Sequence, residues 1–325
     1  MVSHKKWLIN ILLTLVLMLL PLFLSNYMTY LVNLAGIYVV CIIGLNFLMG
    51  LGGQMFFGAV AIMSIGAYSA ALLSIHFNFP FYLSIPCAGL IATILSLTII
   101  FPGLRVTGIY LGMVSLGFHY ILEQIIGGWK SLTGGHDGLS VAKASIAGVD
   151  LASDKAFYYV VLTVVALGLW GAMNLMKMRV GRAIWALGQD QVSAAVAGIN
   201  VTFYKIIAFL VCAFYSGISG GLLAHYLRYI TPDHFTVIMS IMIFVGMIIG
   251  GWGSLPGSIA GGFFVIFLPE VIEMAKDGLL SPTTALYDLQ AVISGIIIIL
   301  VVMFIPEGVG DFVKELKLRL GKRDI

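Results

Sequence analysis

The chain has 325 residues, of which 61% are hydrophobic and 10% are charged, and its formal net charge is +3. Soluble domains carry about 25% charged residues, so the composition excludes an ordinary soluble protein, and so small a net charge gives no reason to expect nucleic acid as a partner. Between Lys6 and Arg105 lie 98 residues without an Asp, Glu, Lys or Arg. As helix this run would measure roughly 147 Å at about 1.5 Å per residue, against about 30 Å for a bilayer core. It must therefore cross a membrane several times.

Pro, Gly and polar clusters divide the chain into ten expected spans. Unbroken apolar stretches such as 293–305 favour helices over the alternating pattern of a membrane strand, so the predicted fold is an all-α polytopic bundle forming one transmembrane domain over 1–325. The apolar run at 7–24 is longer than that of a signal peptide and is predicted to be retained. The stretches 236–250 and 256–275 are either two separate spans or one broken unit. The ten spans are 7–24, 28–49, 57–75, 81–101, 106–128, 156–176, 204–227, 236–250, 256–275 and 287–305.

The positions of the basic residues orient these spans, because cytoplasmic segments are enriched in Lys and Arg. With both termini in the cytoplasm, 12 of the 17 basic residues lie inside and five lie outside. The inner set is Lys5, Lys6, Arg105, Lys177, Arg179, Arg182, Lys205, Lys314, Lys317, Arg319, Lys322 and Arg323. Ten spans with both ends inside are therefore expected.

Three connecting or terminal segments are too long to be simple turns. The segment 129–155 is predicted to be external, and the tail 307–325 cytoplasmic. The cytoplasmic segment 177–203 favours helix from 181 to 197, with Asp190 able to cap a turn. Gly198 is then a plausible helix stop.

Two glycine-rich segments at the cytoplasmic side, 50–54 and 250–257, each precede a helix rich in small residues. Gly/Pro-interrupted segments of this kind point to a transporter's path. Gly52 to Gly58 and Gly251 to Gly257 share a spacing of six, which raises the possibility of an internal repeat. The other glycines spaced four apart are better explained by close helix packing. The path candidates in these segments are Gly53, Gln54, Gly253 and Ser254.

Ionisable residues inside the spans are few. His119 and Glu123 are four residues apart on one helix face and could pair, and Glu123 is a further candidate for the path because carboxylates inside membranes are often functional. No carboxylate is expected near the bilayer midplane, which counts against a proton-coupled carrier. The three cysteines have no metal-ligand spacing, and no P-loop or HExxH motif occurs. We expect no catalytic residue, metal or cofactor in this chain.

Seven motifs in order resemble one family, the LivM-type permeases of branched-chain amino acid ABC importers. The resemblance covers nearly the whole chain. The motifs are LNFLMGLGGQMFFG (45–58), IGAYSAAL (65–72), PGLRVTGIYLGMVSLGF (102–118), WKSLTGGHDGL (129–139), GRAIWALGQDQVSAAVAGIN (181–200), ITPDHFT (230–236) and VGMIIGGWGSLPG (245–257). The chain departs from the family at 188–191, where an Arg-Glu pair is common and this sequence has Gly-Gln-Asp-Gln.

The resemblance implies a non-enzymatic, multi-pass subunit of the bacterial cytoplasmic membrane. Its implied partners are a second, related permease in a heterodimer, two cytosolic ATP-binding subunits, an extracytoplasmic solute-binding protein and membrane lipid. The implied solutes are Leu, Ile and Val, although similar permeases handle urea, amides or other amino acids. The segment 177–203 would couple the permease to an ATPase. The candidate coupling residues are Gly181, Arg182, Asp190, Ala194, Ala195, Gly198 and Asn200.

A stand-alone secondary carrier or channel for a small polar solute is the alternative reading of the sequence. In that case 177–203 would be only a linker. A transporter without a P-loop or buried acidic relay, but with a long cytoplasmic helical segment, is better explained by a separate motor. Co-purification with an ATPase would distinguish the two.

Overall fold

The computed structural model describes residues 18–279, apart from 107, 143, 147, 148 and 152, together with residues 295 and 303. In this part of the chain eight helices are long and apolar enough to cross a membrane. They correspond to the second to ninth expected spans, and the pair at 236–250 and 256–275 forms two helices. The chain is therefore a polytopic helical membrane protein. The expected spans at 7–24 and 287–305 lie largely outside the described residues, and the tail at 307–325 lies entirely outside them.

The described elements alternate long helices with short connections. In chain order they are α2 (Asn26–Leu45), the π-helix η1 (Asn46–Leu51), α3 (Ala59–Phe77), α4 (Phe81–Gly103), α5 (Ile109–Gly128), α6 (Lys130–Thr133), the 3₁₀-helix η2 (Gly135–Asp137), β1 (Leu139–Ser140), β2 (Ser145–Ile146), β3 (Val149–Asp150), α7 (Asp154–Lys177), α8 (Arg179–Gln189), α9 (Gln191–Val196), α10 (Val201–Leu227), β4 (Tyr229–Ile230), the 3₁₀-helix η3 (Pro232–Phe235), α11 (Val237–Gly250) and α12 (Gly257–Leu279).

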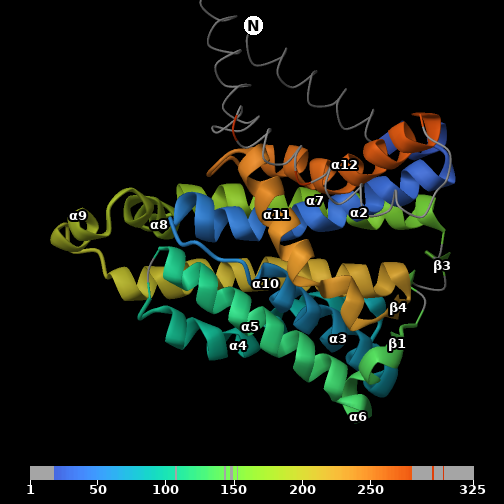
Figure 1. Ribbon diagram of the computed structural model, residues 1–325, viewed down its shortest axis with the longest axis horizontal. Helices are drawn as coiled ribbons and strands as arrows, with labels where there is room; N and C mark the ends of the chain where they lie inside the picture. The colour runs from blue at the N-terminus through green and yellow to red at the C-terminus, as the bar shows by residue number, and fades with distance from the viewer. Residues whose placement is uncertain are drawn as a thin grey trace, which may run out of the picture.

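The long helices form two groups on either side of α10 (Figure 1). On one side α2 packs against α7 and α12, and on the other α3 and α4 pack against each other and against α10. The short helix α11 runs steeply across the direction of the long helices (Figure 1). In the most apolar 18-residue stretch of α2 and η1, 83% of the residues are buried, compared with 22% in the corresponding stretch of α7. The bundle is therefore built around α2, while α7 lies at its periphery.

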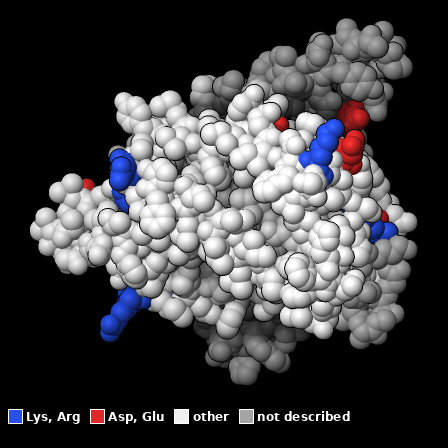
Figure 2. Space-filling model, turned by 90° about the horizontal axis from the view of Figure 1, so that it is seen from below, with Lys and Arg blue, Asp and Glu red and all other residues white. Residues whose placement is uncertain are grey.

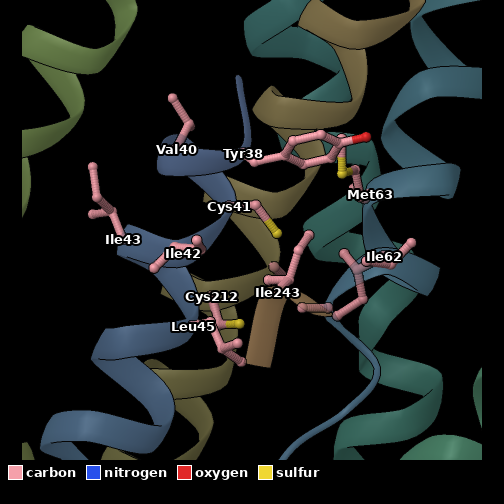
Figure 3. Packing of buried hydrophobic residues seen from close by; sticks show 14 of the residues in the cluster. Tyr38, Val40, Cys41, Ile42, Ile43, Leu45, Ile62, Met63, Cys212 and Ile243 are labelled. Atoms are coloured by element: carbon pink, nitrogen blue, oxygen red, sulfur yellow. The ribbon is translucent and has the colours of Figure 1, made fainter. Parts of the chain in front are cut away.

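The core forms around α2, which is apolar on all sides. Such a helix is stable only when other helices surround it. In α2 every side chain from Ile37 to Leu45 is buried. Cys41 of α2, Ile62 of α3 and Ile243 of α11 belong to one buried cluster and point into the space between these helices (Figure 3). The three cysteines are free.

Glycines allow the helices to approach this closely. A Cβ atom at Gly220 of α10 would clash with the carbonyl oxygen of Met63 on α3, and one at Gly257 would clash with that of Gly250. Gly217, Gly246 and Gly261 belong, like Gly257, to pairs spaced four apart and make contacts of the same kind, which confirms close packing as the role of most such glycines. Gly108 is an exception, because a Cβ there would meet nothing within 4 Å. Its φ of 62° instead serves the turn into α5.

The two ends of the bundle differ from its middle. The broad middle of the face in Figure 2 carries no Lys, Arg, Asp or Glu, and the charged atoms lie towards its ends. At one end β1 pairs antiparallel with β4, and β2 with β3. The sequence predicted no strands in the segment 129–155. These pairs are only two residues long, too short to show a strand pattern in the sequence.

Candidate functional site

At the end opposite the strands, α9 projects beyond the long helices, and α8 lies between α9 and the bundle (Figure 1). We call residues 177–203 the coupling segment after the role predicted for it. The sequence favoured one helix from 181 to 197, but the structure has two, because the backbone of Asp190 is extended. On α8 the side chains of Ile184 and Leu187 are buried against the bundle, whereas Arg182 and Trp185 are exposed. α8 thus holds the segment against the bundle, and α9 extends away from the bundle.

Asp190 is the N-cap of α9. Its carboxylate accepts hydrogen bonds from the backbone N–H groups of Val192 at 3.1 Å and Ser193 at 3.0 Å. The hydroxyl of Ser193 also donates to this carboxylate. Because these bonds stabilise the charged form, the hydroxyl first and the backbone groups next, they lower the pKa of Asp190. The expected capping role of Asp190 is confirmed.

The other predicted coupling residues fall into two groups. Gly181, which lies against the backbone of Leu175 and Met176 in α7, and Ala194 are buried, whereas Arg182, Ala195, Gly198 and Asn200 are exposed. Gly198 has a φ of 83°, so any substitution there strains the backbone. The Asn200 side chain caps α10 by accepting from the N–H of Phe203 at 3.1 Å.

Sequence reasoning missed the most exposed apolar residues of the segment. Val192 is 71% exposed and Val196 is 85% exposed. They are four residues apart on α9 and therefore share one face. The small residues at 194, 195 and 198 were predicted as the contact surface instead. A spacing of four places the two valines on one helix face with or without a break at Asp190, but it does not show that this face is left uncovered.

The two glycine-rich segments lie in contact with each other. We call residues 50–54 the first glycine loop and residues 250–257 the second glycine loop. A Cβ atom at Gly50 would clash with the backbone nitrogen of Gly253, and Gly253 itself lies against Leu51. The sequence predicted each loop separately but not their contact.

Asn46, at the start of the π-helix η1, joins the two loops. Its side chain is fully buried. Its Oδ1 accepts from the N–H of Gly253 at 2.7 Å, and its Nδ2 lies within donor distance of Gly251 O (3.3 Å), Ser254 O (3.1 Å) and Ser258 Oγ (3.2 Å). All four of these contacts go to the second loop and the start of α12.

The coupling segment contacts the first glycine loop from the other side. A Cβ atom at Gly188 of α8 would clash with the carbonyl oxygen of Leu51 and would lie 3.3 Å from the nitrogen of Gly53. The backbone of α8 therefore touches the loop with no side chain between them. Gly53 is exposed, whereas Gln54 is only 2% and Ser254 only 6% exposed. The four path candidates of these loops thus lie together at the end of the bundle that carries the coupling segment.

Glu123 lies elsewhere, on α5. It lines a small cavity with His119 and Phe235, which has room for about one water molecule. The hydrogen bonds of the His119 ring are made with groups other than Glu123. Its Nε2 lies 2.8 Å from Phe235 O and its Nδ1 lies 2.8 Å from Ser240 Oγ.

A polar cluster at the end of the bundle that carries the strands was also missed. Asn33 donates to Asp154 O at 2.9 Å, and the hydroxyl of Tyr226 donates to Asp154 Oδ1 at 2.9 Å. The cluster joins α2, α7 and α10. Among the described residues no group of three His, Cys, Asp or Glu could hold a metal ion.

The sequence also matches a known family model. Residues 27–302 match the model described as the permease component of the branched-chain amino acid transport system. The chain belongs to this permease family. The matched range contains the coupling segment, both glycine loops and all eight described spans.

Individual permeases are similar over most of their length. The high-affinity branched-chain amino acid permease protein LivM of Salmonella typhimurium is 27% identical over 93% of this chain and 74% of its own length. A probable branched-chain amino acid permease protein LivH of Methanocaldococcus jannaschii is 28% identical over 75% of this chain and 79% of its own. The ribose import permease protein RbsC of Haemophilus influenzae is 24% identical over 71% of this chain and 72% of its own. No solved structure gives a significant match.

Proposed function

We propose that this chain is the permease subunit of an ATP-driven importer for branched-chain amino acids. It forms half of a transmembrane channel with a second, related permease. Two ATP-binding subunits dock on the coupling segment, and an extracytoplasmic binding protein delivers the solute. The match of residues 27–302 to the permease family carries this proposal, and the exposed valines of α9 support docking of the ATP-binding subunits at that helix.

We further propose ten spans in the bacterial cytoplasmic membrane, with both termini in the cytoplasm. The division of basic residues supports this orientation, since Arg179 and Arg182 lie on the coupling segment. The same orientation turns the strand-bearing end, with loop 129–155, towards the outside. A stand-alone carrier would need no docking face on α9, and membership of the permease family also favours the importer.

Charge placed on α9 tests the docking face. In the Val192→Glu/Val196→Glu variant, ATP-binding subunits expressed with the chain should no longer co-purify with it, because the apolar contact is replaced by two buried charges. Gln189→Glu adds the same charge at an exposed polar position and should retain the subunits. Retention of the subunits by the double variant would contradict docking through α9.

We also propose that the two glycine loops border the translocation path. Irregular backbone within a membrane protein must be covered by protein or face a water-filled cavity. Trp252, 40% exposed in the second loop, is a better probe than the buried Ser254. A cysteine at this position, in a chain without the native cysteines, should react with a water-soluble thiol reagent from the cytoplasm, and transported Leu should slow the reaction. A rate independent of solute would contradict this placement.

A further inference from the structure

The contacts of Asn46 and Gly188 form a continuous connection across the end of the bundle that carries the coupling segment. Gly188 of α8 lies against the backbone of Leu51 in the first loop. Asn46, five residues before Leu51, holds Gly253 and Ser254 of the second loop. We propose that Asn46 is a positioning residue that makes the two glycine loops move as one body with α8. The proposal rests on the proposed function. It identifies the contact through which a movement of the coupling segment reaches the second glycine loop.

The local backbone supports this role. Gly52 N–H donates to Phe47 O at 3.2 Å, five residues back, which closes the wider turn of a π-helix. Single π-turns within helices are frequent at functional sites. Asn46 begins this turn, so a change in η1 moves its side chain directly. A change at Gly188 reaches η1 through backbone atoms, which cannot rotate away as a side chain could.

The burial of Asn46 indicates a specific coupling. An amide buried without partners costs free energy, and here the amide meets partners from one segment, 251–258. These partners lie on the loop between α11 and α12 and on the first turn of α12. If the loops separated, Asn46 would lose all four contacts at once. The two loops are thus held together more firmly than van der Waals contact between glycines would achieve.

A labelling cycle in the full-length chain tests the proposal without ATP-binding subunits. The reporter is the thiol-labelling rate of Trp252→Cys in membranes, in a chain whose native cysteines are replaced by Ala. Gly188→Ala should change this rate about threefold or more, because it forces α8 against Leu51. In the presence of Asn46→Ala the same substitution should change it little, since coupled residues are not additive. Gly117→Ala, whose Cβ would meet nothing within 4 Å, should have no effect in either background.

Equal effects of Gly188→Ala with and without Asn46→Ala would overturn the proposal, as would no effect with Asn46 present. If Asn46→Ala fails to accumulate, Ser258→Ala replaces it. This variant removes one acceptor of the Asn46 side chain and should reduce the effect of Gly188→Ala without abolishing it. An undiminished effect with Ser258→Ala would contradict the proposal.

The complete importer separates this proposal from the proposed function. With Asn46→Ala the ATP-binding subunits should still co-purify and hydrolyse ATP within about twofold of the parent, whereas Leu uptake should fall about tenfold. Normal uptake would contradict a positioning role for Asn46. Failure of the parent chain itself to bind ATP-binding subunits would contradict the proposed function, and the labelling cycle would still decide the role of Asn46.

Discussion

At Asp190 the backbone leaves the helical region, with a φ of −158° and a ψ of 119°. The side chain then caps the next turn, so the direction of α9 depends on a single carboxylate. Asn keeps one of the two accepting oxygens and is a favoured N-cap residue, whereas Ala keeps neither. The orientation of the apolar face at Val192 therefore depends on an acceptor at position 190, rather than on its charge.

We expect Asp190→Ala to weaken binding of the ATP-binding subunits about fivefold, since the first turn of α9 loses its cap. Asp190→Asn should bind within about twofold of the parent. Titration of the purified permease with the ATP-binding subunits measures both values. Equal weakening by Ala and Asn would show that the charge, and not the cap, matters.

Gly220 belongs to the contact between α10 and α3. Gly220→Ala should destabilise the protein by about 1–3 kcal/mol, because its Cβ meets a backbone carbonyl that cannot rotate away. Thermal unfolding in detergent should show a lower transition temperature. Gly117→Ala on α5 is the matched control and should leave the transition unchanged or raise it, since Ala favours helix more than Gly. A transition unchanged by Gly220→Ala would contradict the close contact.

Between elements, some close contacts involve side chains and others only backbone. Gly36 of α2 faces Val161 of α7, where a Cβ would meet the valine's Cγ1. Gly257 of α12 faces the carbonyl oxygen of Gly250. Only the first contact can be relieved by shortening a neighbouring side chain.

Gly36→Ala should therefore lower thermal stability, and Val161→Ala should recover part of the loss in the double variant. The pair is expected to be non-additive because the two residues are in contact. Gly257→Ala has no such partner, so Val161→Ala should not rescue it. Thermal unfolding of the single and double variants measures the interaction. Strict additivity of Gly36→Ala and Val161→Ala would show that α2 and α7 do not pack as described.

The positions of the long helices could be predicted from the sequence, because local composition determines them. Eight spans follow from apolar length, because a bilayer imposes nearly the same length on every span. The contact between the loops could not be predicted, since Asn46 and its partners are 205 to 212 residues apart. A single Asn in an apolar helix carries no local sign of where its partners lie. The valines of α9 were missed for a different reason, since their spacing of four does not show that their face is left uncovered.

For the whole molecule, the orientation in the membrane is open to direct test. A reporter active only in the cytoplasm should be active when fused after Ile325 and inactive when inserted after Ala142, which is exposed beyond β1. Insertion after Gly198, in the coupling segment, should give activity and serves as the positive control. Activity after Ala142, or its loss after Ile325, would contradict ten spans with both termini in the cytoplasm.

The position of α2 at the centre of the bundle has a consequence for how the protein is made. Asn46 emerges from the ribosome more than 200 residues before the loop that satisfies it. At about 5–20 residues per second this interval lasts about 10–40 s. During that time an unsatisfied amide lies in a nascent helix, and its neighbours α10, α11 and α12 are completed only towards the end of the interval or after it. Stalled chains that end before residue 250 should therefore be bound by insertion chaperones or degraded by membrane proteases, whereas chains that have completed α12 should escape both.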